Sequence, residues 1–306
     1  MNLILLLWVA LMIGSVAVRG SSAPADAPRS AAYLEFRNRL RRNMLVAAAL
    51  PLLAYLVLFA SAVVDTLSER DLALPSAAEY GVFLLIIPGV FVFPLAALCV
   101  TEYTSRPAAV RGASLVPRTA RDYAPKWLFG TAGIVTVLGL TSPSLLLVDT
   151  IAEPHYFRAP RIDVHYGGVS SDLWLPAVYL VIALILAVAT ITQAVRRRDL
   201  DTETTSDKWS RSGVVARALA LLMLAGILPI ANALSSLDSV AWAYRSYLGG
   251  GGVPLPAYDW LTDLGVKSWS GWALAAAAVA ALLALAVFAF PPHRSARTRT
   301  AAPAVA

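Results

Sequence analysis

The chain has 306 residues, of which 58% are hydrophobic and only 14% charged. A soluble domain carries roughly 25% charged residues, so this composition argues against a soluble globular protein and favours a membrane protein. The net charge of +6 arises from 25 Lys and Arg spread between apolar stretches. We therefore expect no nucleic-acid partner, because the bases do not gather in one stretch of chain.

Seven apolar stretches without charged residues follow one another along the chain. They cover residues 1–18, 43–64, 80–101, 127–148, 173–195, 218–237 and 271–290. Each is about long enough to cross a hydrocarbon core of about 30 Å at 1.5 Å per residue. Backbone amides in that core must bond within their own segment, which favours helices. The sequence predicts an all-α, polytopic integral membrane protein with a single seven-helix domain over residues 1–290.

The bases between these stretches predict the orientation. Twenty of the 25 Lys and Arg lie in the first, third and fifth gaps and in the tail. Excess Lys and Arg mark the cytoplasmic side, so we expect the N-terminus outside and the C-terminus inside. The stretch 1–18 has no positive residues at its start, so we interpret it as a retained helix rather than a cleaved signal. Residues 291–306 are expected to form a disordered cytoplasmic tail.

The cytoplasmic bases also predict a partner. Each Lys or Arg near an anionic leaflet contributes about 1 kcal/mol, which is enough to explain arginine clusters beside helices. We expect the bilayer's anionic headgroups, or a cytoplasmic regulator, to contact Arg39, Arg41, Arg42, Arg196, Arg197 and Arg198.

The last outer gap, residues 238–270, is rich in aromatic residues and is too short for a core of its own. We expect its Trp and Tyr side chains to anchor the chain at the membrane interface. The run Gly249–Gly252 predicts a flexible hinge.

The outer loop 150–174 holds the one chemical constellation of the chain. Two of the three histidines lie there, each two residues after a carboxylate. Imidazole and carboxylate together can hold zinc or a similar ion. We expect no cofactor. The alternative is a divalent metal held by Glu153, His155, Asp163 and His165. The spacing matches no established zinc motif, and a chance gathering of polar residues in a loop is the competing interpretation.

The same loop resembles a short domain found in SdpI-type bacterial membrane proteins, which confer immunity to a secreted killing peptide. The resemblance rests on Pro160, His165, Tyr166, Gly167 and Asp172, followed by Trp174 and an apolar stretch. It implies a ligand- or signal-binding role for these residues together with Asp163, and a multi-pass protein of a bacterial cell membrane.

Three functions follow from these observations. The first is a non-enzymatic membrane protein that provides immunity against, or senses, a membrane-active peptide outside the cell. The second is a transporter, permease subunit or lipid-handling protein, because Pro88, Pro94 and Pro143 interrupt the third and fourth apolar stretches. The third is a metal-dependent membrane enzyme at the outer loop. No catalytic residues are predicted, since the chain has no nucleophile elbow or phosphate-binding loop, and a non-enzymatic role is favoured.

Overall fold

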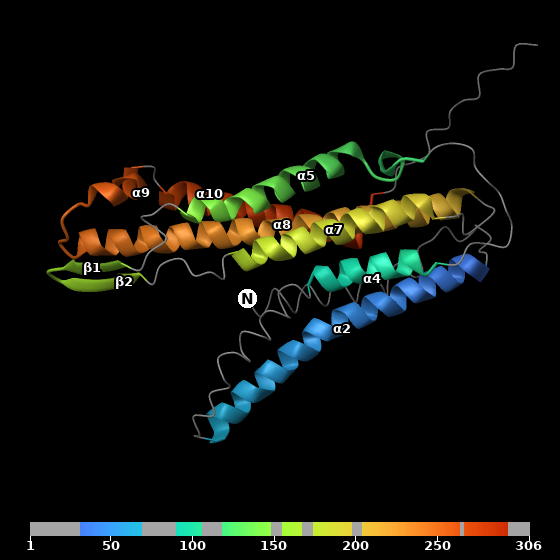
Figure 1. The fold of residues 1–306 in the computed structure, drawn as a ribbon. Helices are drawn as coiled ribbons and strands as arrows, with labels where there is room; N and C mark the ends of the chain where they lie inside the picture. The colour runs from blue at the N-terminus through green and yellow to red at the C-terminus, as the bar shows by residue number, and fades with distance from the viewer. Residues whose placement is uncertain are drawn as a thin grey trace, which may run out of the picture.

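The computed structural model describes residues 31–68, 90–105, 118–147, 155–166, 174–197, 204–263 and 266–292. Over these ranges the chain is mainly helical, as predicted, with one β-hairpin at an end of the bundle (Figure 1). Among the described residues, three helices are long and apolar enough to cross a membrane, over Leu175–Arg196, Asp207–Gly249 and Gly271–Ala289. The predicted helix over 1–18, residues 80–89 and the tail beyond 292 lie outside the described residues.

Helix α8 (Thr204–Gly249) is the central element of the bundle. It packs against α5 (Lys126–Thr141), α7 (Trp174–Arg196) and α10 (Val266–Ala289), as Figure 1 shows. Small side chains line its buried surface and let neighbouring helices approach closely; they include Ala216, Ala218, Ala220 and Ala225. At about 1.5 Å per residue its 46 residues extend about 69 Å, more than twice the thickness of a hydrocarbon core.

Two glycines set the closest approach between α5 and α8. A Cβ atom on Gly139 would lie 2.6 Å from the Gly226 carbonyl oxygen and 2.8 Å from a Leu180 methyl carbon. A Cβ atom on Gly226 would lie 2.8 Å from the Val135 side chain. The two backbones therefore touch at this crossing, and only glycine fits on either side of it.

The lateral surface of the bundle is apolar. Large hydrophobic side chains point away from the core on α5, α7 and α10, for example Ile134, Ile185 (63% exposed) and Leu282 (66% exposed). A soluble bundle would present polar residues at such positions. This surface suits a lipid environment, in agreement with the long apolar helices.

Chain segments far apart in the sequence meet at one end of the bundle. The start of α2 (Ala31–Ser68) lies there with the end of α4 (Val92–Tyr103), since Arg39 on α2 donates a hydrogen bond to the Thr104 carbonyl. The ends of α7 and α10 and the start of α8 join them. Hydrogen bonds from Arg211 to Ala194 and from Arg217 to Phe288 place these three termini together. Consequently α8 runs antiparallel to both α7 and α10.

The opposite end of the bundle carries a small module around the last turns of α8. It consists of strands β1 (His155–Ala159) and β2 (Ile162–Tyr166), the 3₁₀ turn η4 (Pro256–Tyr258) and the short helix α9 (Asp259–Asp263). Figure 1 shows the hairpin and α9 on different sides of α8.

The structure differs from the sequence prediction at several elements; the helix predicted over 43–64, for example, extends over Ala31–Ser68. The helix predicted over 218–237 extends over Thr204–Gly249, because helical periodicity continues through polar segments at both ends. The stretch predicted as one helix over 127–148 changes at Ser142 into the 3₁₀ helix η2 (Ser142–Leu147). Pro143 accounts for this change, because it lacks an amide proton and its ring clashes with the preceding turn. The all-α prediction also omitted the β-hairpin.

Candidate functional site

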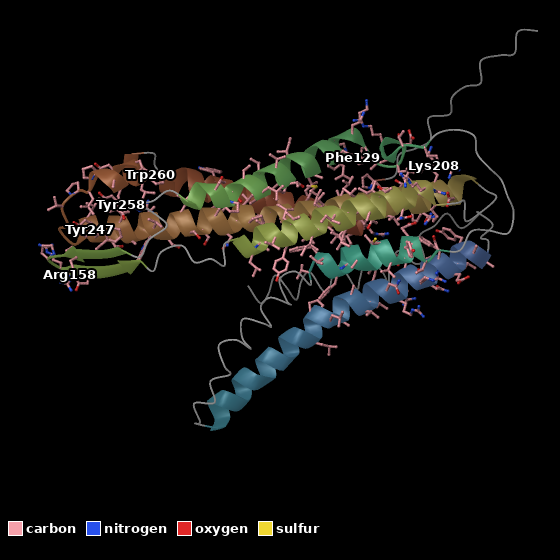
Figure 2. All side chains as sticks on the ribbon, in the orientation of Figure 1. Phe129, Arg158, Lys208, Tyr247, Tyr258 and Trp260 are labelled. Carbon is pink, nitrogen blue, oxygen red and sulfur yellow. The ribbon has the colours of Figure 1, made fainter. Side chains whose placement is uncertain are left out.

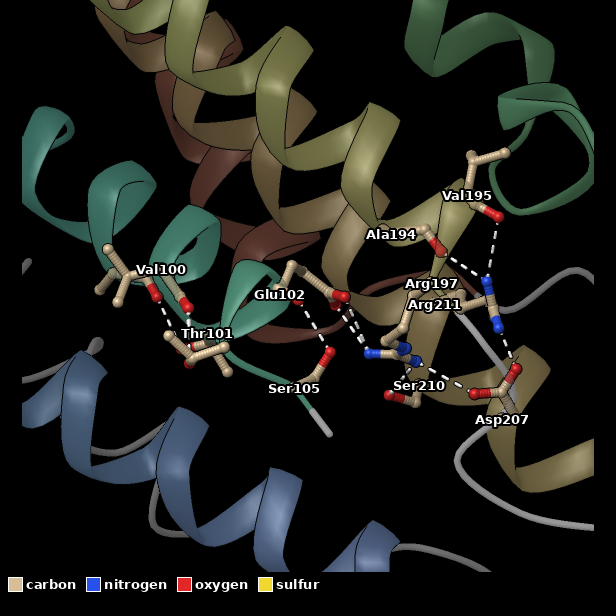
Figure 3. A network of polar contacts seen from close by, with 12 residues as sticks. Val100, Thr101, Glu102, Ser105, Ala194, Val195, Arg197, Asp207, Ser210 and Arg211 are labelled. Carbon is tan, nitrogen blue, oxygen red and sulfur yellow. Dashed lines mark hydrogen bonds and ion pairs between the residues drawn. The ribbon is translucent and has the colours of Figure 1, made fainter. Parts of the chain in front are cut away.

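Four buried charged side chains form an ion-pair cluster where the termini of α4, α7 and α8 meet: Glu102, Arg197, Asp207 and Arg211 (Figure 3). Arg197 donates from Nη1 to both Glu102 oxygens, at 2.8 and 3.0 Å. Its Nη2 reaches Asp207 Oδ1 at 3.1 Å and Ser210 Oγ at 3.3 Å. The side chains of Glu102 and Arg197 are 0% and 3% exposed, so each charge is stabilised by its protein partners and not by hydration.

Arg211 connects the ion-pair cluster to the backbone of α7. Its Nε donates to Asp207 Oδ2 at 2.5 Å, and its Nη1 donates to the carbonyls of Ala194 and Val195 at 2.7 and 3.1 Å. The last carbonyls of a helix have no partner within the helix and carry its negative dipole end. Arg211 satisfies two of them and places its positive charge there.

Aromatic rings enclose the ion-pair cluster. Arg197 lies over the Phe36 ring at 4.4 Å from its centroid, and Arg211 lies 5.9 Å from the Tyr123 centroid. Such stacking stabilises a desolvated guanidinium. Burial raises the pKa of the Glu102 carboxyl above its ordinary value, and the charges of Arg197 and Arg211 oppose that rise. Burial likewise raises the pKa of Tyr123, against the effect of Arg211.

Six arginines are predicted to contact lipid or a partner, and those that the structure describes lie in different environments. Arg41, Arg42 and Arg196 are exposed and remain free to meet headgroups. Arg39 is ion-paired with Glu35 at 2.7 Å. Arg197 is buried in the ion-pair cluster, where a lipid headgroup cannot reach it. Arg198 lies outside the described residues.

At the other end of the molecule, four aromatic side chains form a small core that we call the aromatic cap: Phe157, Tyr244, Tyr247 and Tyr258. The Phe157 ring, on β1, lies 5.5 Å from that of Tyr247 and 5.3 Å from that of Tyr258, the latter edge to face. The rings of Tyr244 and Tyr258 are also 5.3 Å apart. All four side chains are buried, and Figure 2 shows Tyr247 and Tyr258 at the end of the bundle where α8 and α9 lie. The interfacial role predicted for these tyrosines is therefore wrong, since they pack within the protein.

Tyrosine hydroxyls fix the segment that follows α8. The Tyr247 hydroxyl donates to the Val253 carbonyl at 3.0 Å. The Tyr244 hydroxyl accepts from the Leu255 amide at 2.8 Å and lies 3.1 Å from Asp259 Oδ1. Gly251 has φ +87°, a conformation that ends helices and favours glycine. The glycine run predicted as a hinge is thus a hydrogen-bonded turn, in which the Gly252 amide donates to the Tyr247 carbonyl at 3.0 Å.

The hairpin joins this turn through its tip. The Arg161 amide donates to the Gly250 carbonyl at 3.2 Å, and Pro160 lies beside Gly251. The strands are antiparallel, with Tyr156 opposite His165 and Arg158 opposite Asp163. Residues alternate between the two faces of a strand, so position 157, which faces α8, shares its face with position 155 and not with position 163 or 165.

This register bears on the predicted binding and metal sites. Asp163 and Pro160 are exposed, and positions 163 and 165 share one face of the hairpin, as expected for residues two apart. His165 and Tyr166 lie on β2 and His155 lies on β1, where position 155 pairs with position 166 and not with position 163 or 165. Glu153, Gly167 and Asp172 lie outside the described residues. Among the residues that the structure describes, no three His, Cys, Asp or Glu side chains gather closely enough to hold a metal.

Sequence reasoning missed both the ion-pair cluster and the aromatic cap. A weak signal existed for each. Asp207 and Arg211 are four residues apart on one helix, the spacing of an intrahelical ion pair. Leu237, Val240, Ala241, Tyr244 and Tyr247 repeat with helical period beyond the predicted span.

Comparison with known proteins adds no assignment. The chain matches no protein-family model, no curated protein and no solved structure.

Proposed function

We propose that the chain is a non-enzymatic, seven-span membrane protein of a bacterial cell membrane that binds a membrane-active peptide or envelope signal on its outer side. Residues 1–18, 43–64 and 80–101 supply the first three spans, and the N-terminus lies outside. The exported side then carries the hairpin and the aromatic cap. The ion-pair cluster lies on the cytoplasmic side, near the C-terminus.

The meeting of helix termini supports the proposed topology. Described parts of the three arginine-rich gaps and the start of the tail all lie at one end of the bundle. The hairpin and the segment after α8, which belong to base-poor gaps, meet at the other end. In a chain that crosses the membrane repeatedly, consecutive gaps lie on opposite sides. The described odd gaps and the described even gaps are therefore expected at opposite ends of the bundle, as they are here.

The aromatic cap is the observation that carries the binding role. With the proposed span over 218–237, residues 238–249 of α8 continue about 18 Å beyond the hydrocarbon core. A membrane helix does not need this extension to span the bilayer, yet here it is buttressed by a hairpin, a 3₁₀ turn and α9 around four rings. A rigid module held away from the membrane is well suited to meet a ligand from outside.

A survival experiment tests the proposed function. Cells lacking the gene are challenged with membrane-active peptides and with culture supernatant of the parent strain. We expect sensitisation that the intact gene reverses and that Asp163→Ala with His165→Ala does not, at equal protein levels in the membrane. Ser239→Ala, on the exposed surface of α8 outside the hairpin, serves as the matched control and should protect fully. Equal survival with and without the gene would refute the proposal.

A further inference from the structure

The tip of the β-hairpin has a charge that contrasts with the rest of the proposed outer side. The outer gaps carry eleven acidic and five basic residues. Two of those five bases, Arg158 and Arg161, lie at the tip on either side of Pro160, and all three side chains are exposed. Asp163, the acidic residue of β2, lies directly opposite Arg158 in the strand register. Figure 2 shows Arg158 at the extreme end of the molecule.

The backbone holds the tip in one geometry. The hydrogen bond from the Arg161 amide to Gly250 fastens the tip to the turn after α8, and Phe157 anchors β1 in the aromatic cap. Two arginines on a backbone fixed in this way lose less conformational entropy on binding an anion than arginines on a mobile loop. They can donate in a forked arrangement to carboxylates.

Exposed apolar residues follow the turn that the hairpin tip contacts. The turn that Arg161 contacts leads directly into Val253, which is 72% exposed, followed by exposed Pro254. Their backbone is fixed because the Val253 carbonyl accepts the Tyr247 hydroxyl proton. A ligand that pairs with Arg158 and Arg161 and extends along this turn would meet these apolar side chains.

The distance from the membrane argues against a lipid headgroup as the anion. The tip lies beside Gly250, thirteen residues beyond the end of the proposed span at Leu237 along α8. This spacing corresponds to about 20 Å at 1.5 Å per residue. Electrostatic attraction is screened over about 8 Å at physiological ionic strength, so headgroup charges act only weakly on the tip.

We propose that the hairpin tip, formed by Arg158, Pro160 and Arg161 with Val253 beside it, is a docking surface for a peptide segment in which acidic and apolar residues alternate. The carboxylates pair with the two guanidinium groups, and the apolar side chains cover Val253. This inference rests on the proposed function and specifies the chemistry of its ligand.

Binding of matched peptides to the full-length protein in zwitterionic nanodiscs tests this inference. Fluorescein-labelled peptides alternate Leu with Glu, Gln or Lys, and fluorescence anisotropy reports their affinity. We expect the Glu peptide to bind most tightly, and Arg158→Gln with Arg161→Gln to weaken it about tenfold through loss of charge-assisted hydrogen bonds. Arg245→Gln is the matched control, because Arg245 lies at the same end of α8 but beside Asp238, at 3.9 Å. Val253→Ser should weaken the Glu peptide while keeping its preference over the Gln peptide.

The inference would be overturned by equal binding of the three peptides, by unchanged binding of the Glu peptide to the double variant, or by an equal loss in Arg245→Gln. Tighter binding of anionic than zwitterionic vesicles through the same arginines, without peptide binding, would assign the tip to lipid and also refute it. If the survival experiment succeeds while the Glu peptide does not bind, only the docking chemistry fails and the proposed function stands.

Discussion

Arg197 binds both oxygens of Glu102 through a single nitrogen, Nη1, although 95 residues separate them in the sequence. The bond joins the end of α4 to the end of α7, and both side chains are almost completely buried. Removing one member of such a pair leaves an uncompensated charge, whereas replacing both by apolar residues is much better tolerated. We therefore expect the pair to specify which helices meet at this end more than to add net stability.

Glu102→Ala should lower the free energy of unfolding by about 3–5 kcal/mol, because it leaves Arg197 buried beside Asp207 alone. The double variant Glu102→Leu with Arg197→Met should lose clearly less than Glu102→Ala. Thermal or denaturant unfolding of the purified protein in detergent measures both. Single and double variants of equal stability would contradict the pairing.

Arg211→Lys should destabilise the protein by about 2 kcal/mol or more, although it keeps the charge. One ammonium cannot reach both Asp207 Oδ2 and the α7 carbonyls that the guanidinium reaches with Nε and Nη1. Lys208→Ala, in the same turn of α8 but exposed, is the control and should change little. The same unfolding assay distinguishes the two, and a fully stable Arg211→Lys protein would show that the forked geometry is unnecessary.

The glycine crossing gives a test of packing between α5 and α8. Gly139→Ala or Gly226→Ala should cost about 1–3 kcal/mol, because the new methyl group overlaps the facing helix. Gly130 and Gly133 lie on the same helix α5 with nothing within 4 Å of a Cβ, so their alanine variants should be as stable as the parent or slightly more stable. If all four variants behaved alike, the close approach would not exist in the membrane.

The sequence predicted the helix boundaries best for helices that consist almost entirely of uncharged residues. The stretches 173–195 and 271–290 correspond closely to α7 and α10, because a run without charge is what a lipid-facing helix requires. For α8 the same criterion captured only the middle. Its N-terminal flank carries Asp207, Arg211 and Arg217, whose partners outside α8 include Arg197, the Ala194 carbonyl and the Phe288 carbonyl.

The excess of Lys and Arg on the cytoplasmic side is a count that does not distinguish one arginine from another. For this reason the sequence predicts Arg197 at the membrane surface together with its neighbours. Its neighbour Arg196 is indeed exposed, and one residue of helical rotation turns Arg197 toward Glu102 instead. Nothing local in the sequence reveals that partner, because Glu102 lies on another helix. For the same reason Phe157 gave no signal: its ring contacts belong to Tyr247 and Tyr258, far along the chain.

Phe157→Ala should loosen the whole module at this end of α8. Loss of a buried aromatic ring costs about 3–5 kcal/mol, and here the ring contacts Tyr247 and Tyr258 directly. We expect faster protease cleavage between residues 250 and 258 and a reduced near-ultraviolet circular dichroism signal from the tyrosines. Val253→Ala, at an exposed position of the same segment, should leave both measurements unchanged. Equal cleavage of the two variants would show that the hairpin does not brace the turn.

Single cysteines test the proposed orientation. Cys99 is the one cysteine of the chain, so a Cys99→Ala background is free of thiols. A membrane-impermeant maleimide should label Arg161→Cys in intact cells, because position 161 is exposed at the hairpin end of the bundle. It should label Lys208→Cys only after permeabilisation, since position 208 is exposed at the end that carries most bases. The reverse pattern would invert the protein in the membrane, which would turn the hairpin and the aromatic cap inward and remove the basis for binding a peptide from outside. Labelling of both positions in intact cells would contradict the membrane topology altogether.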